Sequence, residues 1–327
     1  MGKMILAGDI GGTKTHLALF EEEEKSKWVL DEKFKSADHD SLRSIVKQFL
    51  ADHPEHQVEK ACFGIAGPVK DRKCKATNLP WIVDADLIEK EANIPSVSLI
   101  NDLEANAFGI QCLDEDEFFS LNEGEKHAGN AALISAGTGL GEAGLFWDEK
   151  RYHPFACEGG HCSFAPENDL EIQLLRYLRK QYDHISVERV LSGPGLHRLY
   201  KFLIDAGLEK EKEEVKKAFE KTDPAYVITK MGMSGACPAC SRALDLFVSI
   251  YGSEAANLAL KMLSIGGLYI GGGIAPKILN ELKEGGFMKR FIQKGRFTSL
   301  LLAIPVKVVL NENTALLGAS HYAREHG

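Results

Sequence analysis

The sequence has few of the features that mark secreted or membrane-spanning proteins. Its 327 residues include 7 cysteines, an odd number at scattered positions, so a framework of disulfide bonds is not expected. The apolar opening at 4–7 ends at Gly8 and Asp9, which is too short for a signal-peptide core. No later segment reaches the roughly 18 apolar residues of a membrane span. We therefore expect a cytoplasmic protein without a membrane partner.

Positive charge is also scarce relative to negative charge. The chain has 39 lysines and arginines against 47 aspartates and glutamates, a formal net charge of −8. Because nucleic-acid binding relies on clustered lysine and arginine side chains, nucleic acid is not expected as a partner. A nucleotide is not excluded, since a few backbone N–H groups and a metal ion can bind its phosphates. The length allows two domains, each with its own core.

One pair of cysteines has a spacing that metal sites use. Cys237 and Cys240 form a Cys-x-x-Cys pair, and Cys157 and Cys162 could complete a set of four ligands. Structural zinc sites usually have a second Cys-x-x-Cys pair, which this sequence lacks. We therefore expect reduced structural thiols and no zinc.

The first third of the chain combines short β-like runs with a helical pattern. Residues 4–10 and 15–20 are predicted to form two strands joined by a glycine turn at 11–14. Apolar residues at helical spacing predict a helix at 41–53. Further strands are predicted at 28–34, 61–66 and 97–100. A hairpin followed by strands that alternate with helices indicates a mixed sheet flanked by helices.

A comparable order recurs in the second half of the chain. A strand is predicted at 131–135, a turn rich in glycine and threonine at 137–141, and a returning strand at 142–147. A strand at 268–270 precedes three consecutive glycines. We interpret the halves as related α/β domains that face each other across a cleft. The Lys- and Glu-rich stretch at 204–223 is expected to be a solvated helical face.

Neither glycine turn fits a familiar nucleotide-binding motif. A P-loop needs glycine directly before its lysine, where this chain has Thr13 before Lys14, and it must open a helix rather than a strand. The dinucleotide fingerprint needs glycine at the position of Glu142. Both turns are compatible with plain β-hairpins. The pair of turns, with Asp9 beside the first and a hydroxyl from Thr13 and Thr138, favours backbone N–H groups that surround phosphate oxygens.

These segments resemble the bacterial glucokinase family over nearly the whole chain. The similar segments are Gly8-Asp9-Ile10-Gly11-Gly12-Thr13 and Ser135-Ala136-Gly137-Thr138-Gly139-Leu140-Gly141 (phosphate motifs), Leu99-Ile100-Asn101-Asp102 (catalytic), Glu158-Gly159-Gly160-His161 and Glu188-Arg189-Val190-Leu191-Ser192-Gly193-Pro194-Gly195 (sugar binding), and Gly271-Gly272-Gly273-Ile274-Ala275-Pro276 (adenosine). Each segment alone is weakly specific, but six in the family's order are strongly specific. Related kinases and repressors with structural zinc carry a compact cysteine cluster where this chain has Cys162-Ser163-Phe164-Ala165-Pro166, which again argues against zinc.

The resemblance implies an actin/hexokinase-like (ribonuclease H-like) fold, closure of two domains over glucose, and a homodimer. It implies a small domain at 1–112, completed by about 302–327 through a C-terminal helix at 311–324, and a large domain at 113–301. ATP and Mg²⁺ are the implied cofactors. The implied nucleotide-binding residues are Gly8, Asp9, Ile10, Gly11, Gly12, Thr13, Gly137, Thr138, Gly139, Gly271, Gly272 and Gly273.

Phosphoryl transfer to a sugar needs a metal ion on the phosphates and a group that accepts the hydroxyl proton. Asp102, at the end of a predicted buried strand, is the candidate general base, and a helix N-cap is its alternative role. Asp9 is the candidate metal ligand, acting through water. The candidate sugar-binding residues are Asn101, Asp102, Glu158, His161 and Glu188.

Two aromatic side chains near these segments have competing interpretations. His161, considered alone, could be a structural histidine with its hydrogen bonds satisfied rather than a sugar ligand. Trp81 follows Asn78-Leu79-Pro80 and could line the sugar entrance or pack in a core.

The favoured function is ATP-dependent phosphorylation of D-glucose to glucose 6-phosphate. The first alternative is a kinase for another hexose or an amino sugar, since the same carboxylates would suit mannose or glucosamine. The second is a non-catalytic sugar-sensing regulator on the same fold. A DNA-binding regulator would need a module of about 60 residues, for which the phosphate turn at Gly8 leaves no room, and Asp102 argues against a non-catalytic sensor.

Overall fold

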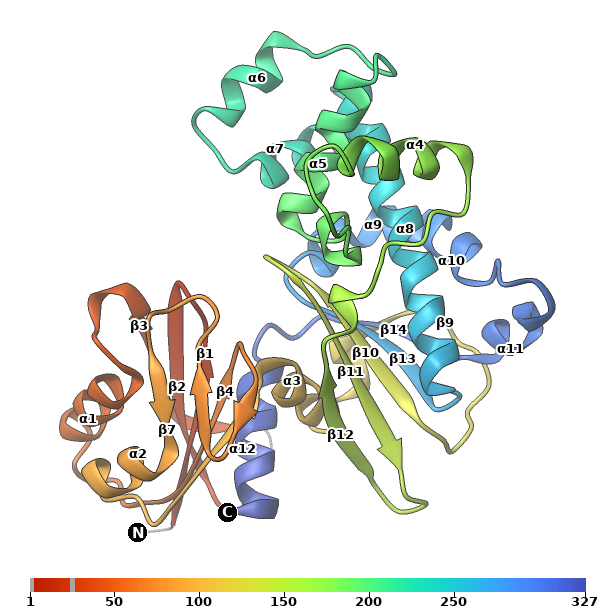
Figure 1. The fold of residues 1–327 in the computed structure, drawn as a ribbon. Coiled ribbons are helices and arrows are strands. Elements are labelled where there is room, and N and C mark those ends of the chain that lie inside the picture. Colours follow the sequence, from red (N-terminus) through yellow and green to blue (C-terminus); the bar gives the residue numbers. More distant parts are fainter. Residues whose placement is uncertain (1–2, 24–26) are drawn as a thin grey trace. The chain divides into compact units, whose positions relative to one another are not determined.

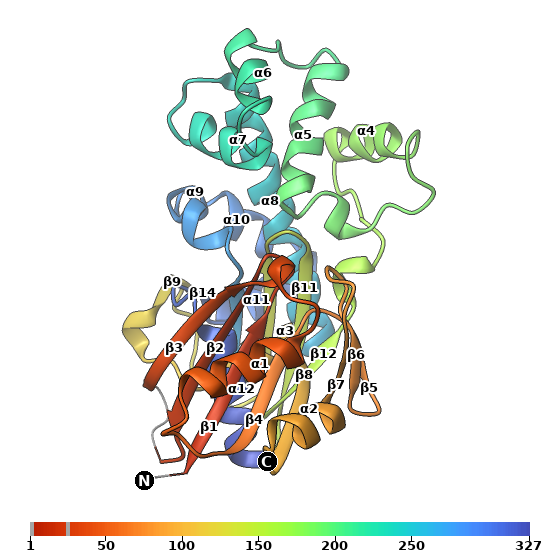
Figure 2. The same ribbon diagram turned by 90° about the vertical axis from the view of Figure 1, so that its left-hand side faces the viewer.

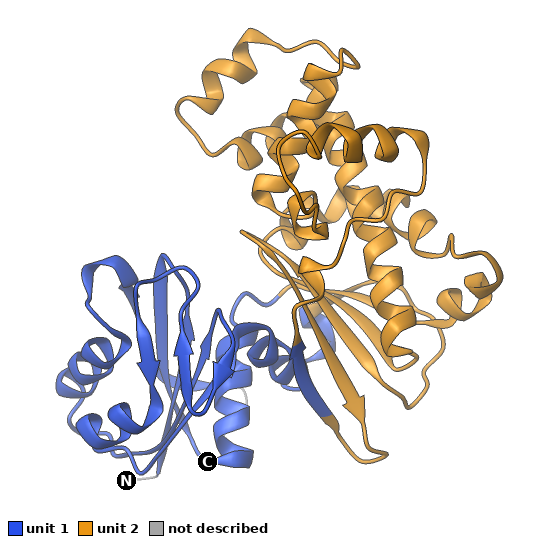
Figure 3. Cartoon of the chain, viewed as in Figure 1, with its two compact units in different colours: residues 1–117, 153–156, 311–327 blue, residues 118–152, 157–310 orange. Residues whose placement is uncertain are grey.

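A computed structural model describes residues 3–23 and 27–327 of the chain and divides them into two compact units (Figures 1 and 3). Unit 1 contains the described residues up to Glu117, together with 153–156 and 311–327; unit 2 contains 118–152 and 157–310. The chain thus divides at 117 and 311 rather than at the expected 112 and 302. The reason lies in β14 (Val306–Val309), which pairs with β9 (Phe118–Asn122) inside the sheet of unit 2.

Unit 1 is built on a mixed sheet with the strand order β3-β2-β1-β4-β8. Its strands are β1 (Met4–Ile10), β2 (Lys14–Glu21), β3 (Trp28–Lys35), β4 (Val58–Ile65) and β8 (Ser96–Asn101). β2 runs antiparallel to β1 and β3, whereas β1, β4 and β8 are parallel. A small separate sheet contains β5 (Val69–Lys70), β6 (Lys73–Lys75) and β7 (Ile82–Asp84). The predicted hairpin and the other predicted strands of this half are confirmed.

Alternate residues of β1 enter two different cores, as the period of two in a strand requires. Met4 and Leu6 join a cluster with side chains of α1 (Leu42–Asp52) and α2 (Ala85–Ala92) on one face of the sheet. Ile5 and Ala7 join a cluster with α3 (Asp102–Ile110) and α12 (Thr314–His326) on the other face. Figure 2 shows α1 and α2 in front of the sheet. The predicted helices at 41–53 and 311–324 are confirmed, the second as part of unit 1.

The sheet of unit 2 repeats this pattern of pairing. Its order is β12-β11-β10-β13-β14-β9, with β10 (Ala131–Ala136), β11 (Leu140–Trp147), β12 (Tyr152–Cys157) and β13 (Gly267–Gly271). Like β1, β10 has an antiparallel hairpin partner on one side and a parallel strand on the other. The predicted recurrence is confirmed. β11 begins at Leu140 rather than at 142, because Leu140 pairs with Ala136, so the turn is only Gly137–Gly139.

The helices of unit 2 include one long helix, α8, which packs against several of the others. They are α4 (Asp169–Leu178), α5 (Gly193–Asp205), α6 (Glu213–Phe219), α7 (Pro224–Met233), α8 (Pro238–Met262), α9 (Leu279–Lys283), α10 (Gly286–Phe291) and α11 (Thr298–Ala303). α8 packs against α5, α7, α10 and β10. The helical face expected at 204–223 is interrupted, since only α6 is helical between the end of α5 and Pro224. No helix of the described residues is long and apolar enough to cross a membrane.

Candidate functional site

The first glycine turn, between β1 and β2, is closed by backbone and serine hydrogen bonds. Gly11 N donates to Lys14 O at 3.0 Å, and Ser36 N donates to Thr13 O at 3.2 Å. The Ser36 hydroxyl donates to Gly11 O at 2.8 Å. A Cβ at Gly12 would lie 2.7 Å from the Cβ of Asn78, so this glycine lets a neighbouring loop approach the turn. The turn is therefore held in place by its own hydrogen bond and by the segments that carry Ser36 and Asn78.

Two predicted carboxylates lie at the same edge of the unit 1 sheet. Asp9 pairs with Gly64 of β4, and a Cβ at Gly64 would lie 3.8 Å from the Cα of Asp102. Burial and the charge of Asp102 raise the pKa of Asp9 from 3.8 to about 6, against the opposing charge of Lys14. The two acids are thus close enough to interact electrostatically. Gly64 is a site-forming residue that the sequence reasoning missed, and its position in a buried strand was the available signal.

Asn101 and Asp102 join β8 to α3, where both side chains meet the start of the helix. Asn101 Oδ1 accepts a hydrogen bond from Leu103 N at 2.9 Å, which makes Asn101 the N-cap residue. Its Nδ2 donates to Gly67 O at 3.2 Å. Asp102 Oδ1 also accepts from Leu103 N, at 3.0 Å. Asn101 and Asp102 therefore share the capping role that was considered for Asp102 alone. The Asn101 side chain makes hydrogen bonds through both its oxygen and its nitrogen.

The second glycine turn, between β10 and β11, is supported by different partners. Gly137 N donates to Gly139 O at 2.8 Å, and Gly193 N at the start of α5 donates to Gly137 O at 2.8 Å. Glu188 Oε2 accepts from Leu140 N at 3.0 Å, and a Cβ at Gly139 would lie 2.5 Å from the same oxygen. One of the predicted sugar ligands thus contacts one of the predicted phosphate turns.

The three predicted sugar-binding residues of unit 2 come from two segments that pair with each other. Phe164 N donates to Ile185 O at 2.8 Å, and Val187 N donates to Cys162 O at 2.9 Å. This pairing joins the turn that carries Glu158 and His161 to the one-turn helix η4 (Val187–Arg189), which carries Glu188.

Glu158 and His161 lie side by side on the surface of unit 2. His161 Nε2 lies 3.9 Å from Glu158 Oε2, and the side chains are 58% and 71% exposed, respectively. The proximity expected from Gly159-Gly160 is confirmed. His161 is not a buried structural histidine, so both side chains are accessible to a ligand.

A pocket of about 730 Å³ opens beside the second glycine turn. It is lined by Gly137, Thr138 and Gly273, which were predicted, and by residues of α5, α7 and the segment after β13: Gly193, Pro194, Leu196, Asp223, Ala225, Tyr226, Thr229, Lys230, Met233, Ile274, Lys277 and Ile278. The α7 residues were missed because 224–233 carries no recognisable motif, and Asp223 was missed because 204–223 was interpreted as a solvated face. The pocket is mainly apolar, with Lys230 and Lys277 at its wall.

Four of the predicted nucleotide-binding residues are packed closely against neighbouring parts of the chain. Gly8 has no room for a Cβ beside Phe63 and Leu17, and Ile10 is buried in the core. Gly271 is the last residue of β13, and at Gly272, which has a positive φ of 82°, a Cβ would overlap the carbonyl oxygen of Ala136. Contacts from these positions to a phosphate or a nucleoside would have to use backbone atoms.

Trp81, Cys237 and Cys240 are buried, and their contacts indicate structural roles. Trp81 is 3% exposed and belongs to the core on the α1 and α2 face of unit 1, which favours the packing interpretation. Cys237 is the N-cap of α8, and its sulfur accepts from Cys240 N at 3.4 Å. Within 3–23 and 27–327, no three His, Cys, Asp or Glu side chains are grouped as a metal site.

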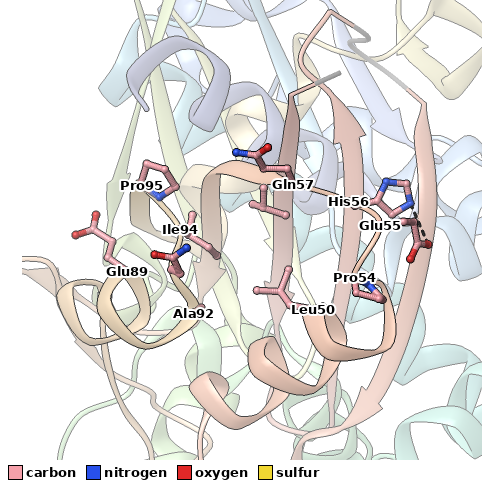
Figure 4. Close-up of a pocket in the computed structure, with 11 residues that line it drawn as sticks. Leu50, Pro54, Glu55, His56, Gln57, Glu89, Ala92, Ile94 and Pro95 are labelled. Carbon is pink, nitrogen blue, oxygen red and sulfur yellow. Dashed lines mark ion pairs between the residues drawn. The ribbon is translucent and has the colours of Figure 1, made fainter. Parts of the chain in front are cut away.

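Unit 1 has a pocket of its own, of about 600 Å³, away from the predicted residues (Figure 4). It is lined by the end of α1, the loop at 54–57 and the end of α2, including Leu50, Ala92 and Ile94. His56 and Glu55 form an ion pair at 3.5 Å at one end. None of the predicted site residues lines this pocket, and it is not part of the candidate site.

Comparisons with known proteins agree over nearly the full length. A family model described as Glucokinase matches residues 6–326. A protein of Nostoc sp. (strain PCC 7120 / SAG 25.82 / UTEX 2576) named glucokinase is 45% identical over 336 residues, covering 97% of this chain and 98% of the relative. The crystal structure of a glucokinase from an Antarctic psychrotroph is 33% identical with a TM-score of 0.86, covering 98% of this chain and 99% of that chain.

A more distant structure agrees in fold. The ROK family glucokinase from Streptomyces griseus, solved in complex with glucose and AMPPNP, is 21% identical with a TM-score of 0.65, and covers 98% of this chain and 99% of its own. The predicted two-domain α/β fold class is confirmed.

Proposed function

The chain belongs to the glucokinase family and is an enzyme that phosphorylates glucose, and we propose that it transfers the terminal phosphoryl group of ATP to the 6-hydroxyl of D-glucose with Asp102 as general base. The observation that carries the proposal is the grouping of Asp9 and Asp102 beside the first glycine turn. A carboxylate that touches the 6-hydroxyl can accept its proton as the oxygen attacks the phosphorus. Such assistance is worth about 10²–10⁴-fold in rate.

Asp9 suits a Mg²⁺ ion that is bound mainly by the phosphates. Mg²⁺ commonly takes one or two carboxylates, several waters and substrate phosphate oxygens rather than a full set of protein ligands. The raised pKa of Asp9 means that its negative charge is poorly compensated in the free protein, and a nearby divalent cation would compensate it. We assign Asp9 the role of metal ligand through water. When bound, the ion would neutralise charge on the transferred phosphoryl group.

The sugar and the nucleotide are assigned to separate parts of unit 2. The exposed pair of Glu158 and His161, with Glu188 on the neighbouring segment, offers acceptors and donors that a hexose needs. The family resemblance alone supports Asn101 as a further sugar ligand. The apolar pocket along α7 suits an adenosine group, and the adjoining turn at Gly137–Gly139 suits its phosphates. The AMPPNP and glucose in the Streptomyces griseus structure support ATP as donor and glucose as acceptor.

We further propose a homodimer that works in the cytoplasm as a glycolytic enzyme. The family resemblance supports the dimer, and light scattering after size-exclusion chromatography would measure it. A monomeric mass at micromolar concentration would contradict the dimer without bearing on catalysis.

The proposed reaction is tested by a coupled assay with glucose, mannose and glucosamine, each with and without Mg²⁺. Glucose should have the highest kcat/KM, and activity should require Mg²⁺. Phosphorus NMR of the product should show the phosphate on the 6-oxygen. A product phosphorylated elsewhere, or full activity in the presence of excess chelator, would overturn the proposed chemistry.

A further inference from the structure

Two acidic side chains are buried together beneath the Glu158 turn of unit 2. Glu142 of β11 is 1% exposed, and Glu254 of α8 is 5% exposed. Among the described residues, Oε1 of Glu142 and Oε1 of Glu254 each lack a hydrogen-bond donor. Buried carboxylates without donors are costly, so a pair of them in contact requires an explanation.

The surroundings supply too little positive charge for two carboxylates. Lys261 Nζ lies 3.6 Å from Glu254 Oε1, and Asn257 Nδ2 donates to Glu254 Oε2 at 2.9 Å. Both of these partners interact with Glu254, and within 3–23 and 27–327 Glu142 forms no ion pair of its own. The neighbouring hydroxyl of Tyr251 is already engaged with Ile134 O and Ala136 N. The pair therefore shares one cation.

A proton on Glu142 removes the electrostatic repulsion between the two carboxylates. Burial and the negative charge of Glu254 raise the pKa of Glu142 from 4.5 to about 7, although Lys261 acts in the opposite direction. A protonated Glu142 can donate a hydrogen bond to the Glu254 carboxylate, which replaces a repulsion by a bond. Near neutral pH the pair therefore exists in two states, with and without this proton.

The Glu142 carboxyl also lies directly against the turn that carries two predicted sugar ligands. A Cβ added to Gly159 would overlap Glu142 Oε2, so the Gly159 backbone is in contact with that oxygen. Gly160 is packed equally closely against the carbonyl of Leu140. The thiol of Cys157, which precedes the turn, donates to Glu142 O at 3.4 Å. The turn between Glu158 and His161 thus rests on Glu142 and the start of β11.

We propose that Glu142, protonated and hydrogen-bonded to Glu254, is a positioning residue that supports the Gly159-Gly160 turn and so sets the positions of Glu158 and His161 for glucose. The proposal rests on the proposed function, because it takes those two residues as sugar ligands. When the proton is lost, two carboxylates face each other in a buried space. They separate, and Glu142 Oε2 shifts against Gly159, which displaces the turn.

The proposal predicts that glucose binding weakens as the pH rises. With a pKa of about 7, Glu142 is about nine-tenths protonated at pH 6 and about one-tenth protonated at pH 8. If only the protonated state binds glucose well, the apparent Kd rises about tenfold between these values. Isothermal titration calorimetry with glucose alone, on the full chain, measures this without relying on catalysis.

The decisive variant is Glu142→Gln, whose amide donates to Glu254 at every pH. Its glucose Kd should stay near the parent's pH 6 value at pH 8. His161 and Cys157 are unchanged in this variant, so the comparison with the parent isolates the effect of Glu142. Glu281→Gln is the matched control: burial also raises the pKa of Glu281, but its neighbours are Glu284 and Asp245. This control should keep the parent's pH dependence.

Three outcomes separate the alternatives. If Glu142→Gln keeps the parent's rise in Kd, or if the parent shows no rise, the positioning role is refuted. If Glu142→Gln does not fold, Glu254→Gln supplies the amide from the other side and should flatten the profile in the same way; a retained rise in that variant also refutes the proposal. Glu158→Gln tests the proposed function separately. Unchanged glucose binding in that variant removes the turn from the sugar site, whatever Glu142 does.

Discussion

The two glycine turns have the same topology but different supports. The first joins β1 to β2 and is fixed by Ser36, with the acids Asp9 and Asp102 beside it. The second joins β10 to β11 and is fixed by Glu188 and by the start of α5 at Gly193, beside an apolar pocket. The same hairpin thus lies beside carboxylates in unit 1 and beside an apolar pocket in unit 2.

This difference is the basis of the division of roles that we propose for the two units. Carboxylates at the edge of a parallel sheet suit a metal ion and proton transfer, whereas a mainly apolar pocket with lysines at its wall suits a nucleoside. The second turn also differs because it contacts a predicted sugar ligand: Leu140 N at the end of the turn donates a hydrogen bond to Glu188. Changes in unit 1 should therefore affect the chemical step, and changes around the second turn should affect binding.

The largest effect is expected for Asp102→Asn in unit 1. The amide preserves the shape of the side chain but cannot accept a proton, so kcat at saturating glucose should fall at least about a hundredfold. ATP binding and thermal stability should stay near those of the parent, because Asn101 continues to cap α3. Near-normal kcat with a lowered Tm would show instead that Asp102 acts only at the helix start.

A smaller effect, on KM, is expected from the carboxylates of unit 2. Glu158→Ala should raise the glucose KM by roughly tenfold to a hundredfold, equivalent to the loss of a charged hydrogen bond worth about 1.5–3 kcal/mol. Glu188→Ala should raise the KM of both glucose and ATP, because Leu140 N loses its acceptor beside the phosphate turn. Steady-state kinetics with each substrate varied separately measure both. An ATP KM that is unchanged in Glu188→Ala would refute the link between the two sites.

Alanine substitutions at Gly139 and Gly137 test, with one added methyl group each, whether Glu188 links the ATP and glucose sites. Gly139→Ala should raise the KM of ATP and of glucose several-fold, because its Cβ would lie 2.5 Å from Glu188 Oε2 and must displace that carboxylate. Gly137→Ala adds its methyl where no atom lies within 4 Å, so the free protein should keep its stability. Thermal melts and kinetics of both variants give the comparison. Equal glucose KM values in the two variants would contradict the role of Glu188 as the shared contact.

The smallest effect is a change in stability with pH at Asp9. Its folded-state pKa of about 6 exceeds the ordinary 3.8, so the folded protein binds this proton more tightly, and the group destabilises the fold progressively as the pH rises from about 4 to 6. Asp9→Asn should therefore raise the Tm at pH 8 and change it little at pH 4. The same variant should require more Mg²⁺ for activity. A Tm that does not rise at pH 8 would show that the Asp9 charge is compensated in the free protein.

Much of the fold could be predicted because it depends on local patterns. The β1–β2 hairpin, the helix at 41–53 and the second hairpin follow from apolar alternation, helical spacing and glycine positions. The boundary of β11 was misplaced by two residues, since strand pairing with Ala136 extends it into the turn. The pocket along α7 was missed, because no local pattern of 224–233 indicates what it faces.

The sequence by itself determined the family, the order of the elements and the identity of the candidate acids and glycines, because these depend on residue types and on short spacings along the chain. Only the tertiary structure decided which of those residues share a space. Gly64 brings α3 close to Asp9, the pairing of 162–164 with 185–187 brings Glu188 beside the Glu158 turn, and packing buries Trp81. The pairing of Glu142 with Glu254 likewise joins a strand to a helix more than a hundred residues later. Such contacts depend on how strands and helices far apart in the chain pack together, which no short stretch of sequence encodes.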